Sequence, residues 1–478
     1  MLFNSFSFAV FLPIVFALYW LLQKRDLKVQ NILLLSASYY FYACWDWRFL
    51  FLLMFSTLLD FYTGIRMKDA SNNQNKKVWF WASIIINLGF LGVFKYYNFF
   101  AENLQIALQS VGWQVDFWTL QVILPVGISF YTFHGLSYVV DIYYNRIEPS
   151  RNFVNYAVFV SFFPLLVAGP IERATHLLPQ IEKKRIFNYS QAVDGLRQIL
   201  WGLFKKVVIA DNCAFYANII FNDYQDQSGS TLLIGAFFFT IQIYGDFSGY
   251  SDIALGTARL FGIELLRNFN YPYFSRDIAE FWRRWHISLS SWFKDYLYIP
   301  LGGSKGGKWM QVRNTFIIFI VSGFWHGANW TFIAWGFLNA VYFLPLLLTN
   351  NNRNHLSIVA EHSSLPSFKE IFQMGITFFI TMMAWVFFRS ESMTQALSIC
   401  REIFSTSLFS LPAQRPLYMI LAIGIFMIIE WMGRRERFAL ESFLLNRHRV
   451  MRWGFYYVLM MAILLFAGKE QTFIYFQF

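Results

Sequence analysis

Two histidines mark the part of this chain that could carry chemistry. His286 lies in a segment rich in charge and tryptophan, and His326 lies in a charge-free run. A neutral imidazole can take a proton from a hydroxyl or a thiol while an acyl group moves, and burial favours the neutral ring. We therefore expect acid–base chemistry here. The alternatives are a hydrogen-bonded structural histidine at position 326 and an interfacial polar residue at position 286.

The run around His326 has the composition of membrane-embedded chain. Residues 314–352 contain no Asp, Glu, Lys or Arg, and a bilayer core takes ~20 apolar residues, so the run can cross about twice. Its middle is interrupted by Ser322, Gly323, His326, Gly327 and Asn329. A polar group at that depth is costly unless it faces a cavity or finds partners, which makes His326 a candidate functional residue.

The segment around His286 has the spacing of an amphipathic helix. Apolar residues recur every three or four positions at Ile278, Trp282, Trp285, Leu289, Trp292, Tyr296 and Ile299. This pattern predicts one helix over residues 276–299, lying along the cytoplasmic membrane surface. Arg283 and Arg284 then face anionic donor or lipid groups, and His286 lies at the edge of the apolar stripe.

A second polar stretch, IYGDFSGYSDIALG at 241–256, places Asp246 and Asp252 in apolar surroundings. Buried carboxylates need partners, and Arg283 or Arg284 could supply them. The stretch either lines a substrate channel or packs helices closely through its Gly and Ser residues.

Other chemistries fit the residues less well. His134, His286 and His326 do not form the within-helix pairs of a membrane haem protein, so His134 is expected to serve packing. No short-spaced cluster of Cys, His and carboxylate predicts a metal site. The glycine-rich loop at 301–308 lacks the spacing of a phosphate-binding loop and predicts a flexible basic turn.

The composition predicts an all-α polytopic membrane protein. Of the 478 residues 57% are hydrophobic and 14% are charged, whereas soluble domains average about 25% charged residues. The net charge of +11 is explained by loops that face anionic lipid, so nucleic acid is not expected as a partner. We expect a single domain over residues 1–478.

Charge-free segments predict the membrane spans, and loop charges predict their direction. The uncharged first 23 residues are expected to be a retained span. The basic loops place the N-terminus outside and the loop 433–452 in the cytoplasm. The segment 152–170, with its prolines and glycine, is expected to enter the membrane and return. The expected spans are 2–22, 30–46, 48–66, 78–97, 118–141, 152–170, 195–220, 231–260, 313–330, 331–349, 371–388, 416–432 and 453–468.

The two histidine segments together resemble a known family. FWRRWHISLSSWFKDYLYIPLGG, followed about 40 residues later by SGFWHGANWTFIAWG, is similar to the membrane-bound O-acyltransferase (MBOAT) family. The opening MLFNSFSFAVFLPIVFALYW, the middle LPVGISFYTFHGLSYVVDIY, the GPIER segment and the closing FIYFQF look like its bacterial alginate O-acetylation branch.

This resemblance implies a fold and a site. The fold is a ring of transmembrane helices around a thin central layer with re-entrant and amphipathic helices, and the catalytic core covers about 120–350. The resemblance makes His326 the catalytic base and His286 the second signature position. We expect substrate contacts from Arg283, Arg284, Asp246, Asp252, Asn329 and Trp325.

The resemblance also implies an activity. An acetyl group would pass from a cytoplasmic donor, acetyl-CoA or another acyl carrier, across the bacterial inner membrane to periplasmic acetyltransferase partners that modify a secreted polysaccharide such as alginate. D-alanyl transfer and peptidoglycan O-acylation by the same mechanism are alternatives. A transporter of a lipid-linked sugar is less well supported, because such folds often show two matching halves with broken helices, whereas one broken region is visible here.

Overall fold

The computed structural model describes residues 1–120, 124–166, 169–467, 471 and 473–474. Within these residues the chain forms helices and no strand. The helices belong to two compact units. Unit 1 contains residues 1–192 and 258–266, and unit 2 contains residues 193–257 and 267–478. The expectation of a single domain over residues 1–478 stays a prediction.

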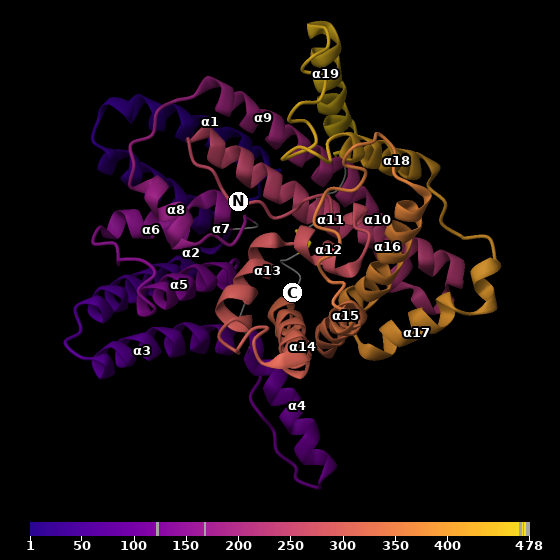
Figure 1. Cartoon of the computed structure of the whole chain (residues 1–478), viewed down its shortest axis with the longest axis horizontal. Helices are drawn as coiled ribbons and strands as arrows, with labels where there is room; N and C mark the ends of the chain where they lie inside the picture. Colours follow the sequence, from indigo (N-terminus) through magenta and orange to yellow (C-terminus); the bar gives the residue numbers. More distant parts are fainter. Residues whose placement is uncertain (121–123, 167–168, 468–470, 472, 475–478) are drawn as a thin grey trace. The chain divides into compact units, whose positions relative to one another are not determined.

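Unit 1 is built around the long helix α2, which packs against α3, α5 and α6 (Figure 1). A non-helical residue, Asp46, with φ −154° and ψ 111°, divides α2 between the predicted spans 30–46 and 48–66. The predicted division is therefore confirmed. The helices of unit 1 are α1 Phe6–Leu21, α2 Leu27–Lys68, α3 Asn73–Leu91, α4 Tyr97–Ser110, α5 Ile128–Tyr143, α6 Phe153–Ser161, α7 Phe163–Leu166 and α8 Ala174–Ile181.

The segment 152–170 does not form one membrane-crossing helix in its described part. α6 has nine residues and ends at Ser161, and the non-helical Phe162 separates it from α7, which begins at Phe163. Nine residues rise about 14 Å, less than half of the ~30 Å hydrocarbon core. Residues 167–168 lie outside the described residues, so the re-entrant course stays a prediction.

Unit 2 holds both signature histidines and the remaining helices, except residues 189–192 and 258–260 of two of them, which belong to unit 1. Three π-helical turns, at Gly92–Tyr96 in unit 1 and at Phe204–Ala210 and Lys294–Tyr298 in unit 2, interrupt helical stretches. The other helices are α9 Tyr189–Leu203, α10 Asp211–Asn222, α11 Gly229–Leu260, α12 Ile278–Arg284, α13 Ile287–Phe293, α14 Gly307–His326, α15 Trp330–Leu348, α16 Phe368–Arg389, α17 Met393–Ile403, α18 Leu417–Met432 and α19 Arg449–Leu465.

Six of the described helical segments are long and apolar enough to cross a membrane. They are Phe6–Lys24, Leu27–Lys68, Asn73–Ser110, Gly229–Leu260, Trp330–Leu348 and Phe368–Arg389. The prediction of an all-α polytopic membrane protein is confirmed. The ring around a thin central layer remains an expectation from the resemblance.

α14 and α15 form a helical hairpin whose contact depends on two glycines (Figure 1). A Cβ at Gly323 would come within 2.2 Å of the Phe332 carbonyl oxygen, and one at Gly336 within 2.2 Å of the Phe319 carbonyl oxygen. Small residues at such a crossing let two helix backbones touch. The hairpin fixes the end of α14, where His326 lies.

The prediction of one helix over 276–299 was wrong. α12 starts at the N-cap Asp277, whose carboxylate accepts from the Glu280 amide, and it ends after Arg284. Trp285 is extended, and His286 has the left-handed values φ 43° and ψ 54° before α13 begins. Periodicity missed the break because the apolar spacing continues across it, with Trp285 and Leu289 both buried.

Candidate active site

His286 is buried, although the sequence placed it at an interface. Its side chain is at the turn between α12 and α13, and the residue is 1% exposed. The imidazole lies edge-on to the Phe247 ring of α11, with ring centroids 4.6 Å apart. This burial lowers the pKa of His286 to about 3, because desolvation disfavours the charged ring. The ring is therefore neutral at physiological pH.

His326 is the last residue of α14 and is also buried. Gly327 follows in an extended conformation, which ends the helix at this side chain. Three aromatic rings surround the imidazole, with centroids at 4.9 Å for Trp325, 5.2 Å for Trp335 and 5.2 Å for Phe388. These rings come from α14, α15 and α16, so the hairpin and α16 together place His326 in an apolar enclosure.

Trp325 connects the two histidines. Its indole is 4.9 Å from the His326 ring and 6.2 Å from the His286 ring, centroid to centroid. Residues 40 positions apart in sequence are thus brought to one aromatic side chain. Sequence motifs predicted that both histidines matter, but only the fold shows that they share a neighbour.

A cavity of about 830 Å³ runs beside α14 in unit 2. Its α14 lining includes Gln311, Thr315, Ile318 and Ser322, which recur at helical spacing, and Ser322 lies one turn before His326. Apolar lining comes from Trp282, Phe319 and Phe343, whereas Arg283, Lys294 and Arg353 supply positive charge. A volume of this size suits a small-molecule ligand with an anionic group.

One wall of the cavity is a loop that arginines hold by its carbonyl groups. We call residues 349–367 the wall loop; its Asn350, Asn352, Arg353 and Leu356 line the cavity. Arg283 donates to the carbonyl oxygens of Asn352 and His355, both at 2.8 Å. Of the two arginines predicted to meet substrate, Arg283 is therefore the one at the cavity, and it also fixes the wall.

Arg284 is held inside the protein. Its guanidinium donates to Glu280 at 2.7 Å and to the carbonyl oxygens of Asn270 and Ser357 at 3.2 Å each. Burial lowers its pKa, although Glu280 opposes that shift. Arg284 thus holds the wall loop in place through the Ser357 carbonyl oxygen. Direct contact of Arg284 with substrate stays a prediction.

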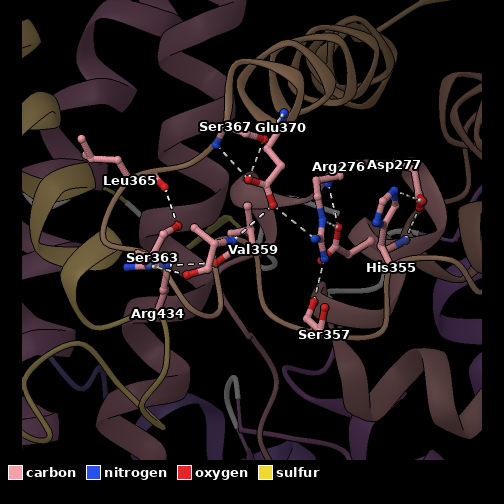
Figure 2. Close-up of polar contacts among 12 residues, drawn as sticks. Arg276, Asp277, His355, Ser357, Val359, Ser363, Leu365, Ser367, Glu370 and Arg434 are labelled. Carbon is pink, nitrogen blue, oxygen red and sulfur yellow. Dashed lines mark hydrogen bonds and ion pairs between the residues drawn. The ribbon is translucent and has the colours of Figure 1, made fainter.

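Arg276 completes this attachment (Figure 2). Its guanidinium forms two bonds of 3.1 Å with the Glu280 carboxylate and donates to the Ser357 carbonyl oxygen at 2.7 Å. Farther along the loop, Arg434 donates to the carbonyl oxygens of Val359, Ala360 and Ser363. Glu280, which sequence reasoning passed over, is the shared carboxylate of this arginine cluster.

Lysines, not arginines, neutralise the two aspartates of α11. Lys206 contacts Asp246 at 2.8 Å, and Lys205 contacts Asp252 at 2.5 Å, both from the π-helical turn after α9. The suggestion that Arg283 or Arg284 pairs with them was wrong. The sequence did contain a signal for this pairing. Two lysines lie within a predicted span, and a charged side chain at that depth needs a partner of opposite charge.

The surroundings of the aspartates are tightly filled. Asp246 also accepts from the Ile474 amide at 2.8 Å. Asp252 lines a cavity of about 20 Å³, which has room for roughly one water molecule. Contact of either aspartate with substrate stays a prediction. The rest of the closing motif, residues 475–478, lies outside the described residues.

Two further residues have structural partners. Asn329 caps α15 by accepting from the Thr331 amide at 3.0 Å, and it donates to the Glu391 carbonyl oxygen at 2.9 Å. Its contact with substrate stays a prediction. In unit 1, His134 is buried and accepts from the Glu172 amide at 3.1 Å, which fits the predicted packing role.

A comparison against protein families matches more than half of the chain. Residues 113–388 match the family model of MBOAT, the membrane-bound O-acyltransferase family, which is more than half of the chain. The chain belongs to the membrane-bound O-acyltransferase family. The matched region contains His286, His326 and the cavity.

Particular relatives are similar over most of their length. A protein named probable alginate O-acetylase AlgI, from Azotobacter vinelandii, is 38% identical over 84% of this chain and 77% of its own. The peptidoglycan O-acetyltransferase of Helicobacter pylori is 37% identical over 84% of this chain and 79% of its own. The teichoic acid D-alanyltransferase of Bacillus subtilis is 28% identical over 45% of this chain and 57% of its own. The predicted resemblance to the alginate O-acetylation branch is confirmed.

Proposed function

We propose that this chain is an O-acetyltransferase of the bacterial inner membrane that passes acetyl groups from a cytoplasmic donor towards a secreted polysaccharide. The observation that carries the proposal is His326, buried at the end of α14 one turn beyond a large cavity. An ionisable side chain within a predicted membrane span is expensive, and this one lies in a chain of an acyltransferase family.

The proposed chemical step uses His326 as a general base. The neutral imidazole takes the proton of an acceptor hydroxyl while the hydroxyl oxygen forms a bond to the acetyl carbon. The bond from that carbon to the donor's leaving atom breaks, and the leaving group receives the proton that the imidazole took, which returns His326 to its neutral form. A positioned base of this kind contributes ~10²–10⁴-fold. The rings of Trp325, Trp335 and Phe388 lie against the imidazole and give it apolar surroundings.

The proposed donor, acetyl-CoA or another cytoplasmic acyl carrier, enters through the cavity beside α14. Its anionic part meets Arg283, Arg353 and Lys294, and its acetyl end lies along the α14 face that leads to Ser322. A guanidinium can bind a phosphate through two hydrogen bonds. Arg284 supports the same region by holding the wall loop.

The acetyl group then leaves on the periplasmic side, where partner acetyltransferases would complete the modification. Relatives named probable alginate O-acetylase support alginate as the first candidate acceptor. A second candidate acceptor is peptidoglycan, because a relative named peptidoglycan O-acetyltransferase covers the chain equally well. The teichoic acid relatives match less of the chain, which makes D-alanyl transfer the weaker alternative.

Transfer of labelled acetyl groups tests the proposal. The purified protein, in membranes with candidate periplasmic partners, is given labelled acetyl-CoA or labelled acyl carrier protein, and the label is followed into alginate or peptidoglycan fragments. Transfer that depends on the protein and saturates with donor supports the proposal. Transport of a lipid-linked sugar with no transfer of acetyl would instead support the transporter alternative.

A further inference from the structure

The backbone of His286 adopts a conformation that needs outside support. Its φ of 43° and ψ of 54° lie in the left-handed region, which side-chain-bearing residues rarely occupy. Such a conformation persists when the surrounding structure determines it, and it is then often part of a functional site. The question is therefore which residues hold this turn.

A short segment, Asn268 to Asn270, ties the backbone on both sides of His286. The Asn270 amide donates to the Arg284 carbonyl oxygen, and the Ile287 amide donates to the Asn268 carbonyl oxygen, each at 2.9 Å. These two bonds fix the chain two residues before and one residue after the left-handed residue.

The side chain of Asn268 adds two more bonds. Its Oδ1 accepts from the Ser288 hydroxyl on α13 at 2.6 Å, and its Nδ2 donates to the Ser251 hydroxyl on α11 at 3.2 Å. Asn268, Ser288 and Ser251 are all buried. Because an amide presents an acceptor and a donor in fixed directions, it joins the turn to the helix that also carries Phe247, the ring against His286.

We propose that Asn268 is a positioning residue for His286. It fastens the left-handed turn to α11 and so holds the imidazole against Phe247 and beside Trp325, the indole that also contacts His326. The proposal rests on the proposed function and adds to it that His286 orients a reactant at the site of acetyl transfer. Asn268 itself touches no reactant.

A double-mutant cycle tests this positioning role. Acetyl transfer is measured for the wild type, Asn268→Ala, His286→Ala and the double variant. Misplacing a reacting group by about 1 Å can cost about 100-fold in rate, so Asn268→Ala should lower kcat by up to about that factor and leave the KM for donor nearly unchanged. In the His286→Ala protein, Asn268→Ala should have little further effect, because the group that it positions is gone.

A buried asparagine of unit 1 provides the matched control. Asn31 donates to Asn155 and to the Ile181 carbonyl oxygen, and it is as buried as Asn268. Asn31→Ala should lower activity only through stability, by the same factor with or without His286. If Asn268→Ala also costs the same factor in both backgrounds, or if His286→Ala is fully active, the positioning role is refuted.

A conservative variant and a structural measurement distinguish a positioning role from poor folding. Asn268→Asp keeps the size of the side chain and the acceptor for the Ser288 hydroxyl. It should therefore retain more activity than Asn268→Ala, and it provides a second variant if the alanine protein folds poorly. Cryo-EM maps of the wild type and the Asn268 variants show where the His286 ring lies whether or not acetyl transfer is found. A ring displaced from Trp325 supports the inference, and an unmoved ring overturns it. Absence of transfer by the wild type would refute only the proposed function.

Discussion

His286 differs chemically from an exposed histidine because the fold keeps its ring neutral. Its pKa falls from 6.5 to about 3, with burial as the cause. A group with a lower pKa in the folded protein binds protons more readily when unfolded. The free energy of unfolding therefore decreases as the pH falls from 6.5 towards the folded pKa, and it is unaffected by this group above 6.5.

His286→Asn should make the protein less sensitive to acid. Asparagine does not titrate, and it tolerates the left-handed backbone of this position. The thermal unfolding midpoint in detergent, compared at about pH 7.5 and about pH 4.5, should fall less in the variant than in the wild type. His362→Asn, at an exposed position, is the control and should behave as the wild type does. An equal fall in all three proteins would contradict the assigned pKa.

Breaking the largely buried pair of Lys205 and Asp252, whose side chains are 4% and 15% exposed, should cost far more than breaking an exposed pair. Lys205→Met leaves the Asp252 carboxylate without its cation, and breaking a buried pair costs about 3–5 kcal/mol. Lys68→Met breaks an exposed pair with Glu148 and should cost at most about 1 kcal/mol. Thermal unfolding of both variants measures the difference. Equal effects would show that the α11 network contributes little to stability.

Residue types and motifs predicted both histidines, but not their surroundings. His326 could be found because it interrupts a charge-free run, and that signal needs no partner. The partners of Asp246 and Asp252 could not be assigned reliably, because pairing depends on how the π-helical turn at Lys205 and Lys206 faces α11. The role of Asn268 had no sequence signal, since nothing in the residue itself points to a left-handed turn 18 positions away.

At the scale of the element, the hairpin of α14 and α15 sets the position of His326. Gly323 lies one turn before His326, where it contacts the α15 backbone. A side chain there must push the two helices apart, which moves the end of α14. Periodicity and hydropathy predicted α14 and α15, because the apolar runs of both helices are long. The same patterns missed the break at His286, because a left-handed residue leaves the apolar spacing intact.

Gly323→Ala should destabilise the protein and lower activity together. Overpacking a filled contact typically costs about 1–3 kcal/mol, which exceeds the gain of up to about 1 kcal/mol from replacing a helical glycine. Gly424→Ala on α18 is the matched control, because a Cβ there meets no atom within 4 Å, and it should be neutral or stabilising. A thermal unfolding midpoint for Gly323→Ala at or above that of Gly424→Ala would contradict the close helix contact.

At the scale of the whole molecule, hydropathy predicted an all-α membrane protein, and loop charge predicted which side of the membrane each loop faces. Most predicted spans coincide with described helices, and the division of α2 at Asp46 follows two of them. The course of 152–170 could not be derived from hydropathy, because short apolar helices and full spans have similar composition. Arrangement of the two units needs long-range contacts that no local pattern encodes.

Cysteine labelling in intact cells tests the orientation. In a background without Cys44, Cys213 and Cys400, a cysteine at Glu102 should react with an impermeant reagent and one at Arg435 should not. Both positions are exposed, so accessibility within the protein does not decide the result. Permeabilised cells, in which both should react, are the control. Reaction at 435 alone, or equal reaction at both in intact cells, would refute the orientation.

The central claim is that His326 is the base of acetyl transfer, and its replacement tests this most directly. His326→Ala and His326→Asn should insert and express as the wild type does, because a smaller or similar neutral group takes the place of the ring. Labelled acetyl transfer should fall ~10²–10⁴-fold, the contribution of a positioned base. His134→Asn, at a buried histidine of unit 1, controls for loss of an imidazole as such. A stably inserted His326→Ala protein that transfers acetyl at nearly the wild-type rate would contradict the account.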